Sequence, residues 1–262
     1  MAITTLDDLP LVNWFDFSLP DACEVDHRNM ILSLKDQKTQ QEHEIIAGAP
    51  TWGNRRVARK RVAQFRNAAY RADATGNSGD YIDFTPTAGI PQAGTITAIV
   101  TAVLDIKGFD GSPNYNDSVI LSNAPNAHVL MIDEGGGYNS VAVGTGQSVF
   151  GNPKHETEIV IGEAYTYLLE WHVGDVATSE LWVNGFKLSD SLNFNGYART
   201  RWATGFNHTA SGSDRIFEGA YCEMAFINAA LTVDEKRDVF EQQRKKWYTT
   251  PTSLCGVGSI VQ

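Results

Sequence analysis

The stretch from Phe217 to Trp247, FEGAYCEMAFINAALTVDEKRDVFEQQRKKW, decides the fold. Its first part, Phe217–Ile227, is a run of aromatic and small apolar residues that predicts a strand. Thr232 and Glu235 follow in a capping-box pattern, in which a hydroxyl and a carboxylate satisfy free backbone N–H groups at the start of a helix. The stretch therefore predicts a strand that leads directly into a helix.

The predicted helix has one apolar face. Val233, Phe240 and Trp247 recur every seven residues, which places them on one side of a helix. Basic residues fill the last turn, Arg244–Lys246, where they suit the helix dipole, and Pro251 prevents continuation. We expect this helix to pack against a sheet rather than to carry chemistry.

The rest of the chain predicts strands. Gly94–Val103 is rich in β-branched residues, and Tyr165–Val173 reads as a second long strand. Asn184-Gly185 joins Glu180–Val183 to Phe186–Leu188, and this dipeptide is the strongest short signal for a type I′ hairpin turn. Shorter strands are predicted at Val119–Leu121, Val129–Ile132, Ser140–Val143 and Ile159–Ile161.

Composition agrees with a single β-rich domain. The chain has 262 residues, of which 42% are hydrophobic and 20% charged, so the chain as a whole is not disordered. No repeat or linker divides it. We predict an all-β protein, an antiparallel β-sandwich of the jelly-roll type with one C-terminal α-helix. The domain is expected over residues 14–248, between an N-terminal arm, 1–13, and a C-terminal tail, 249–262, that docks on a neighbouring molecule.

The net charge of the chain argues against two classes of binding partner. With 21 Lys and Arg against 31 Asp and Glu, the net charge is -10, which does not favour general binding to nucleic acids or anionic membranes. No stretch approaches the roughly 18 apolar residues of a membrane span.

The three cysteines do not indicate a metal site or a disulfide framework. Cys23, Cys222 and Cys255 lack the spacing of either, so we expect reduced thiols, at least two of them buried.

The sequence resembles concanavalin A-like, laminin-G-type jelly rolls. Those domains commonly end, as residues 217–247 do, with a Phe-x-Gly strand, an Asn-x-x-Leu turn, an acidic helix start and a Lys-Trp pair. Trp171-His172, Val183-Asn184-Gly185, Trp14-Phe15-Asp16 and Tyr81–Phe84 match other parts of the same group. The resemblance covers residues 14–247 and implies the concanavalin A-like fold. It does not imply one function, because this fold hosts lectins, hydrolases, lyases and adhesive modules.

The sequence lacks the arrangement of catalytic carboxylates that glycanases of this fold use. Retaining glycanases need two carboxylates about 5–5.5 Å apart, and related glucanases carry them on a Glu-x-Asp-x-Glu strand. Glu156 and Glu158 lie in a predicted loop, and Glu218 and Glu223, five residues apart, are expected on opposite sides of their strand. The signatures of polysaccharide lyases are also absent. We therefore expect a protein that is not an enzyme, and a hydrolase or lyase is our third hypothesis.

Two stretches could bind a ligand. Aromatic rings stack on sugars and amides bind their hydroxyls, so the polar stretch 193–208 is a candidate glycan site, although most Trp residues of a large sandwich belong to its core. Its candidate residues are Asn193, Asn195, Tyr197 and Trp202. The oxygen-rich run 110–117 is a weak candidate for a calcium site, and calcium is the only cofactor that the sequence suggests. An ordinary turn, whose Asp and Asn side chains bond their own backbone, is favoured over a calcium site. Its candidate ligands are Asp110, Asn114, Asn116 and Asp117.

A basic run stands out on this acidic chain. Six of its 21 cations fall within twelve residues, Arg55, Arg56, Arg59, Lys60, Arg61 and Arg66. A solvated strand or loop would explain them, and nucleic-acid binding is a further alternative. We favour docking on an acidic protein surface, including that of a neighbouring copy, over nucleic acid.

These expectations combine into a hypothesis about function. The N-terminus lacks the basic and apolar regions of a secretory signal, which is unusual for a fold that mostly works outside cells. Jelly rolls of this kind occur as head-decoration, fibre and tail components of phages. Our first hypothesis is a non-catalytic structural protein of a phage particle, made in the host cytoplasm and located in the virion. Its partners would be other virion proteins, copies of itself or a surface polysaccharide. The alternative is a carbohydrate-binding, lectin-like module.

Overall fold

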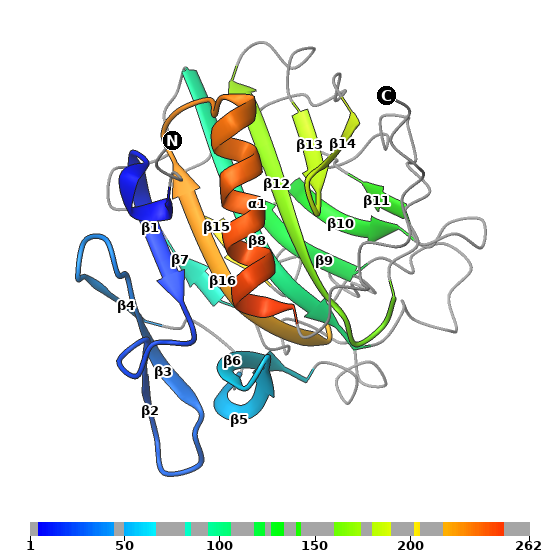
Figure 1. Ribbon diagram of the computed structural model, residues 1–262. Coiled ribbons are helices and arrows are strands. Elements are labelled where there is room, and N and C mark those ends of the chain that lie inside the picture. The colour runs from blue at the N-terminus through cyan, green and yellow to red at the C-terminus, as the bar shows by residue number, and fades with distance from the viewer. Residues whose placement is uncertain are drawn as a thin grey trace.

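The computed structural model describes residues 5–44, 50–66, 82–84, 94–105, 118–123, 127–133, 140–142, 160–173, 180–189, 202–204 and 217–248. These residues form an antiparallel β-sandwich with a short 3-10 helix, η1 (Leu6–Asp8), and one α-helix near the C-terminus, α1 (Val233–Trp247) (Figure 1). No helix in the described ranges is long and apolar enough to cross a membrane.

The larger sheet has eight strands in the order β14-β13-β12-β8-β16-β6-β5, with β1 also paired to β16. Its strands are β1 (Leu11–Asp16), β5 (Thr51–Val57), β6 (Lys60–Phe65), β8 (Gly94–Leu104), β12 (Ala164–Val173), β13 (Glu180–Val183), β14 (Phe186–Ser189) and β16 (Gly219–Ile227). The three longest strands, β12, β8 and β16, lie side by side at its centre and carry the core.

Two smaller sheets complete the described part of the chain. A five-stranded sheet has the order β11-β10-β9-β15-β7, and a three-stranded sheet has the order β2-β3-β4. Their strands are β7 (Ile82–Phe84), β9 (Ser118–Asn123), β10 (Ala127–Asp133), β11 (Ser140–Ala142), β15 (Trp202–Thr204), β2 (Cys23–Val25), β3 (Ile31–Lys35) and β4 (Glu42–Glu44).

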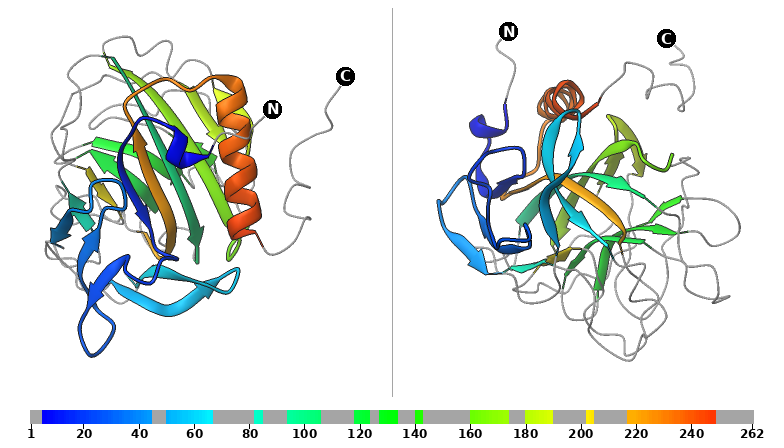
Figure 2. Two further views of the ribbon diagram at one scale, coloured as in Figure 1. Left: turned by 60° about the vertical axis from the view of Figure 1, so that its left-hand side comes forward. Right: turned by 90° about the horizontal axis from the view of Figure 1, so that it is seen from below.

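The large sheet is buried on both faces. Along β8, Ile96, Val100 and Leu104 belong to the core shared with β9, whereas Ile99 and Val103 belong to the clusters that include residues of α1. Successive side chains of a strand point to opposite faces, so one continuous apolar run can supply both cores. Figures 1 and 2 show α1 lying across the face opposite the five-stranded sheet.

The predicted β-sandwich with one C-terminal helix is confirmed, and so are its local signals. Thr232 Oγ1 accepts a hydrogen bond from the Glu235 N–H (3.2 Å), and the Glu235 carboxylate accepts one from the Thr232 N–H (2.7 Å), which completes the capping box. Asn184 and Gly185 have φ angles of 51° and 90°, as the predicted type I′ turn requires. Cys23 and Cys222 are free and buried, whereas Cys255 lies outside the described residues.

Two local expectations differ from the structure. The short strand predicted at Ile159–Ile161 is wrong, because Val160 and Ile161 lead into a turn and β12 begins at Ala164. Within the stretch 1–13, which we expected to be an arm, Leu6, Leu9 and Leu11 are buried, and β1 begins at Leu11. Apolar residues spaced along this stretch explain why it packs onto the large sheet beside α1.

Candidate functional site

Most of the predicted ligand residues lie outside the described part of the chain. This holds for Asn193, Asn195 and Tyr197 of the candidate glycan site, and for Asp110, Asn114, Asn116 and Asp117 of the candidate calcium site. Trp202 is described in its backbone, where it opens β15 and pairs with Phe84 of β7. Among the residues that the structure describes, no group of three His, Cys, Asp or Glu side chains could hold a metal ion.

A groove lies between α1 and the turn that joins β13 to β14. Its volume is about 480 Å³, within the range of about 300–1,000 Å³ that is typical of ligand pockets. The lining combines aromatic rings with charged and amide groups, a combination suited to a ligand that has both apolar faces and hydroxyls. The lining residues are Trp182, Asn184, Gly185, Val233, Arg237, Asp238, Phe240, Glu241, Arg244 and Tyr248.

The floor and one wall of the groove are fixed by hydrogen bonds. Asn184 Oδ1 accepts hydrogen bonds from the Thr166 N–H (2.8 Å) and from the Tyr248 hydroxyl (2.5 Å). Burial raises the pKa of Tyr248, so its hydroxyl stays protonated as a donor at neutral pH. Phe240 of α1 closes the floor, 3.8 Å from the point where a β-carbon on Gly185 would lie. The turn and the helix therefore form one preformed surface.

Trp182 is the aromatic ring that the polar network holds in place. Its Nε1–H donates to Glu180 Oε2 (2.9 Å). The Lys236 and Lys187 ammonium groups lie 5.4 Å and 5.9 Å from the ring centroid, within the range of cation–π contacts. These contacts fix the orientation of the ring in the groove before a ligand arrives, which lowers the entropic cost of binding.

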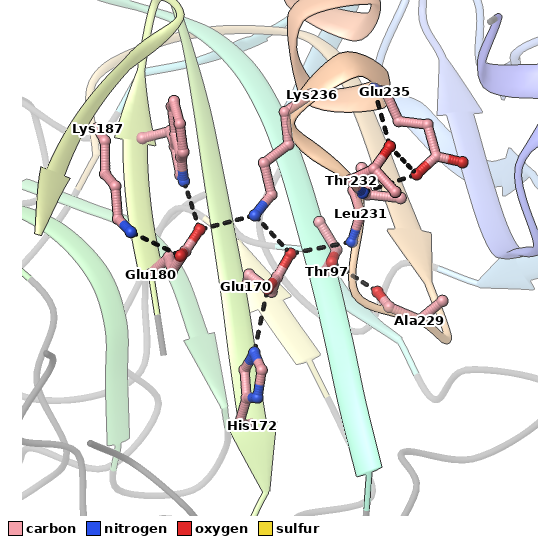
Figure 3. Close-up of polar contacts among 11 residues, drawn as sticks. Thr97, Glu170, His172, Glu180, Lys187, Ala229, Leu231, Thr232, Glu235 and Lys236 are labelled. Carbon is pink, nitrogen blue, oxygen red and sulfur yellow. Dashed lines mark hydrogen bonds and ion pairs between the residues drawn. The ribbon is translucent and has the colours of Figure 1, made fainter. Parts of the chain in front are cut away.

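Two carboxylates share one buried lysine beneath the groove. Lys236 Nζ, on a side chain that is 4% exposed, lies 2.9 Å from Glu170 Oε2 and 2.7 Å from Glu180 Oε2 (Figure 3). Glu170 Oε2 also accepts a hydrogen bond from the Leu231 N–H (3.0 Å), and Glu170 Oε1 lies 3.0 Å from His172 Nε2. Lys187 gives Glu180 a second cation at 2.6 Å.

The electrostatics keep Glu180 ionised. Burial acts to raise its pKa, but hydrogen bonds from Lys187, Lys236 and Trp182 outweigh burial and lower the pKa to about 2. An acid catalyst for glycoside cleavage needs a raised pKa, so that it still carries a proton at working pH. Glu180 has the opposite property, and its arrangement is that of an anchor for α1.

A second anchor holds the other end of the helix. Lys246 Nζ lies 2.6 Å from Asp16 Oδ2 and 2.7 Å from Glu223 Oε2, and the indoles of Trp14 and Trp247 also donate to Glu223. A register shift in β16 between Tyr221 and Glu223 accompanies this arrangement. From the sequence we expected Glu218 and Glu223 on opposite faces of the strand, because successive side chains of a regular strand alternate between its faces. The register shift interrupts that alternation, so the residue spacing alone does not decide which face each side chain takes.

The rim of the groove offers donors and acceptors together. Arg244 binds the Glu241 carboxylate through two hydrogen bonds of 2.8 Å and 2.7 Å, and Arg237 lies 2.8 Å from Asp234 Oδ1. Hydrogen bonds from Arg244 lower the pKa of Glu241 to about 2, so the rim carries charged groups of both signs at neutral pH. Val233, 67% exposed, adds an apolar contact at the helix start.

The basic run forms a hairpin at the edge of the large sheet. β5 is the last strand of the sheet, and β6 pairs with β5 in a register that places Arg56 opposite Arg61 and Val57 opposite Lys60. Arg55 forms an ion pair with Asp105. The structure therefore brings Arg55, Arg56, Arg59, Lys60, Arg61 and Arg66, predicted as one patch, onto one hairpin and the residue after it.

Comparisons with known proteins identify the fold. The sequence matches no protein-family model and no curated protein. The structure is similar to domain 4 of AbnA, a GH43 extracellular arabinanase from Geobacillus stearothermophilus determined in complex with arabinotriose. The two are 13% identical, with a TM-score of 0.60 over 88% of this chain and 98% of that domain.

A second similar structure is a sialidase. Trypanosoma rangeli sialidase in complex with the inhibitor DANA is 15% identical to this chain, with a TM-score of 0.56 over 91% of this chain and 33% of the sialidase chain. At these identities the likeness shows a shared β-sandwich fold. The chain spans nearly all of the arabinanase domain but about one third of the sialidase chain.

Sequence reasoning did not find the groove. It treated Trp182 as a packed or half-packed strand residue, and the structure shows that Trp182 is partly buried. The two walls come from residues about fifty positions apart, and nothing in the sequence indicates that the 184–185 turn meets α1. Val233 was expected on the apolar face of the helix with Phe240 and Trp247, and this expectation was wrong, because Val233 lies in the first turn and is 67% exposed whereas the other two are buried.

Proposed function

We propose that this protein is a non-catalytic carbohydrate-binding module that holds a sugar in the groove between α1 and the β13–β14 turn. The groove itself carries the proposal. It combines an aromatic surface fixed by a charged network with a rim of arginines and carboxylates, groups that can bind neighbouring hydroxyls of one sugar ring.

The structural neighbours support the carbohydrate part of the proposal. The arabinanase domain that this chain spans almost completely is described in complex with arabinotriose, and the sialidase in complex with the inhibitor DANA. A domain of this fold attached to an enzyme would hold the substrate, while another part of the enzyme performs the chemistry. We propose the same division of labour for this chain, with arabinan and sialylated glycans as the first polysaccharides to test.

The carboxylates support the non-catalytic part. Glu170 and Glu180 are brought together by one ammonium group, but both are engaged in ion pairs. Asp16 and Glu223 are engaged in the same way by Lys246. A glycosidase needs one carboxyl group that donates a proton and a second that acts as nucleophile or as base. In both of these described pairs the carboxylates are held by a lysine instead.

The test uses a matched pair of exposed apolar residues. Val233→Glu places a charge in the groove, whereas Leu32→Glu makes the same change on β3, at a residue that is 49% exposed and outside the lining. We expect retention on the best-bound insoluble polysaccharide to weaken about tenfold or more for Val233→Glu, and to stay at the parent level for Leu32→Glu. Equal retention of both variants would contradict the groove as the site, and release of reducing ends by the parent would contradict the absence of catalysis.

A role as a structural subunit of a phage particle is our second candidate function. The observation that favours it is the basic hairpin at a sheet edge of an acidic chain, which suits a protein that docks on others. In this role the chain would be made in the host cytoplasm and located in the virion. Mass spectrometry of purified particles from the source culture tests it, and particles that lack the chain would contradict it.

A further inference from the structure

The hairpin formed by β5 and β6 gathers positive charge at one end of the molecule (Figure 1). Arg56 and Arg61 are direct cross-strand partners, and like charges in that position destabilise a hairpin. The turn between the strands uses Ala58 and Arg59 with φ angles of 48° and 66°, a left-handed conformation that favours Asn or Gly. The hairpin is therefore less stable than one with a neutral cross-strand pair and an Asn-Gly turn, and it holds these cations close together.

Most of these cations have no carboxylate partner in the described part of the chain. Arg55 pairs with Asp105, whereas Arg56, Arg59, Lys60 and Arg61 form no ion pair with any described residue. Arg56 donates to the Arg59 carbonyl (3.0 Å), and the Arg61 guanidinium lies 4.6 Å from the Trp52 ring centroid. Within the described ranges, these four cations are therefore positioned to pair with negative charge on a second molecule.

The rest of the chain has the complementary charge. Six of the 21 cations lie in this patch, which leaves 15 cations against 31 carboxylates and a net charge of −16 for the remaining residues. Exposed carboxylates lie on η1, at Asp7 and Asp8, and at the start of α1, at Asp234, which also pairs with Arg237. The start of α1 lies at the opposite end of the molecule from the hairpin (Figure 1).

We infer that the β5–β6 hairpin of one copy docks on the acidic surface of a second copy that includes the start of α1. The two contacting surfaces differ, so the contact is head-to-tail and leads to a ring or an open chain of copies. The inference names the protein itself as the partner of the basic patch. Because Val233 and Arg237 at the start of α1 also line the groove, a docked hairpin would compete with a sugar, so self-association is measured without sugar.

Sedimentation velocity of the full chain over a range of concentrations tests the inference. Raising salt from about 0.1 M to about 1 M shortens the Debye length from about 10 Å to about 3 Å. We expect a concentration-dependent larger species at the lower salt that dissociates at the higher salt. A parent chain that stays monomeric at both salts, including one that binds an acidic polysaccharide or nucleic acid as a monomer, would overturn the inference.

Two double variants with the same charge change locate the contact. Arg56→Gln/Arg59→Gln removes two exposed cations from the hairpin, and Lys38→Gln/Lys245→Gln removes two exposed cations elsewhere. We expect self-association to weaken about tenfold in the first and to be retained in the second. Equal association of both would overturn the assignment to the hairpin. Far-UV circular dichroism and the urea midpoint establish that each variant is folded.

Discussion

Removing the buried ammonium of Lys236 should cost this protein a large part of its stability. Lys236→Met keeps the length of the side chain and leaves Glu170, whose side chain is 5% exposed, without its cation. Breaking a buried ion pair in this way costs about 3–5 kcal/mol. Glu170 keeps the Leu231 N–H and His172 as partners, and Glu180, 21% exposed, keeps Lys187, so we expect the lower end, about 3 kcal/mol.

Urea unfolding followed by tryptophan fluorescence measures this loss. The control is Lys187→Met, which removes a partly exposed cation from Glu180 and should cost about 1 kcal/mol or less. Lys236→Met/Glu170→Gln also removes the stranded charge and should recover part of the loss. A Lys236→Met protein within about 1 kcal/mol of the parent would refute the reasoning, because it would mean that the buried cation is not an anchor of α1.

Three further predictions follow from single contacts. Because the pKa of Glu180 is lowered from 4.5 to about 2, its stabilising contribution is present above pH 4.5 and lost as the pH falls toward 2, so the urea midpoint should fall less steeply with acid in Glu180→Gln. Equal pH slopes would contradict this. Thr232→Ala should cost about 1 kcal/mol through the lost cap, and Thr232→Ser should cost little; equal urea midpoints would exclude a role for the cap. In Gly219→Ala the new β-carbon would lie 2.0 Å from the Val103 carbonyl oxygen, so thermal unfolding should shift by the equivalent of about 3 kcal/mol, and an unchanged midpoint would count against this close approach.

The elements that the sequence predicted are those with strong local signals. The capping box at Thr232 and Glu235 and the Asn184-Gly185 turn each depend on residues within a few positions of one another, and the structure has both. The β-branched run that forms β8 was also predicted as a strand, because β-branched residues favour strands and a continuous apolar run favours a buried one.

The features that escaped prediction depend on contacts between distant residues. Nothing in the sequence distinguishes Lys236 from the exposed cations of the helix. It is buried because Glu170 and Glu180, on neighbouring strands, both lie within ion-pair distance of its ammonium group. The groove has the same origin, because α1 and the β13–β14 turn meet only in the folded molecule. The basic hairpin was predictable as a patch, but the cross-strand pairing of Arg56 with Arg61 was not.

The candidate glycan residues from the sequence and the groove from the structure lie on different sheets. Trp202 belongs to β15 of the five-stranded sheet, and Trp182 to β13 of the eight-stranded sheet. Trp182 packs in the cluster that includes residues of α1, so we treat the two as alternative sites, and Trp202 stays a prediction from the sequence.

A crystal structure of the chain with the oligosaccharide that it retains best tests the central claim most directly. We predict a sugar in the groove, with one ring against Trp182 and hydroxyls within hydrogen-bonding distance of the Arg237 or Arg244 side of the rim. A sugar bound instead on the five-stranded sheet near Trp202, with the groove empty, would contradict the groove as the binding site.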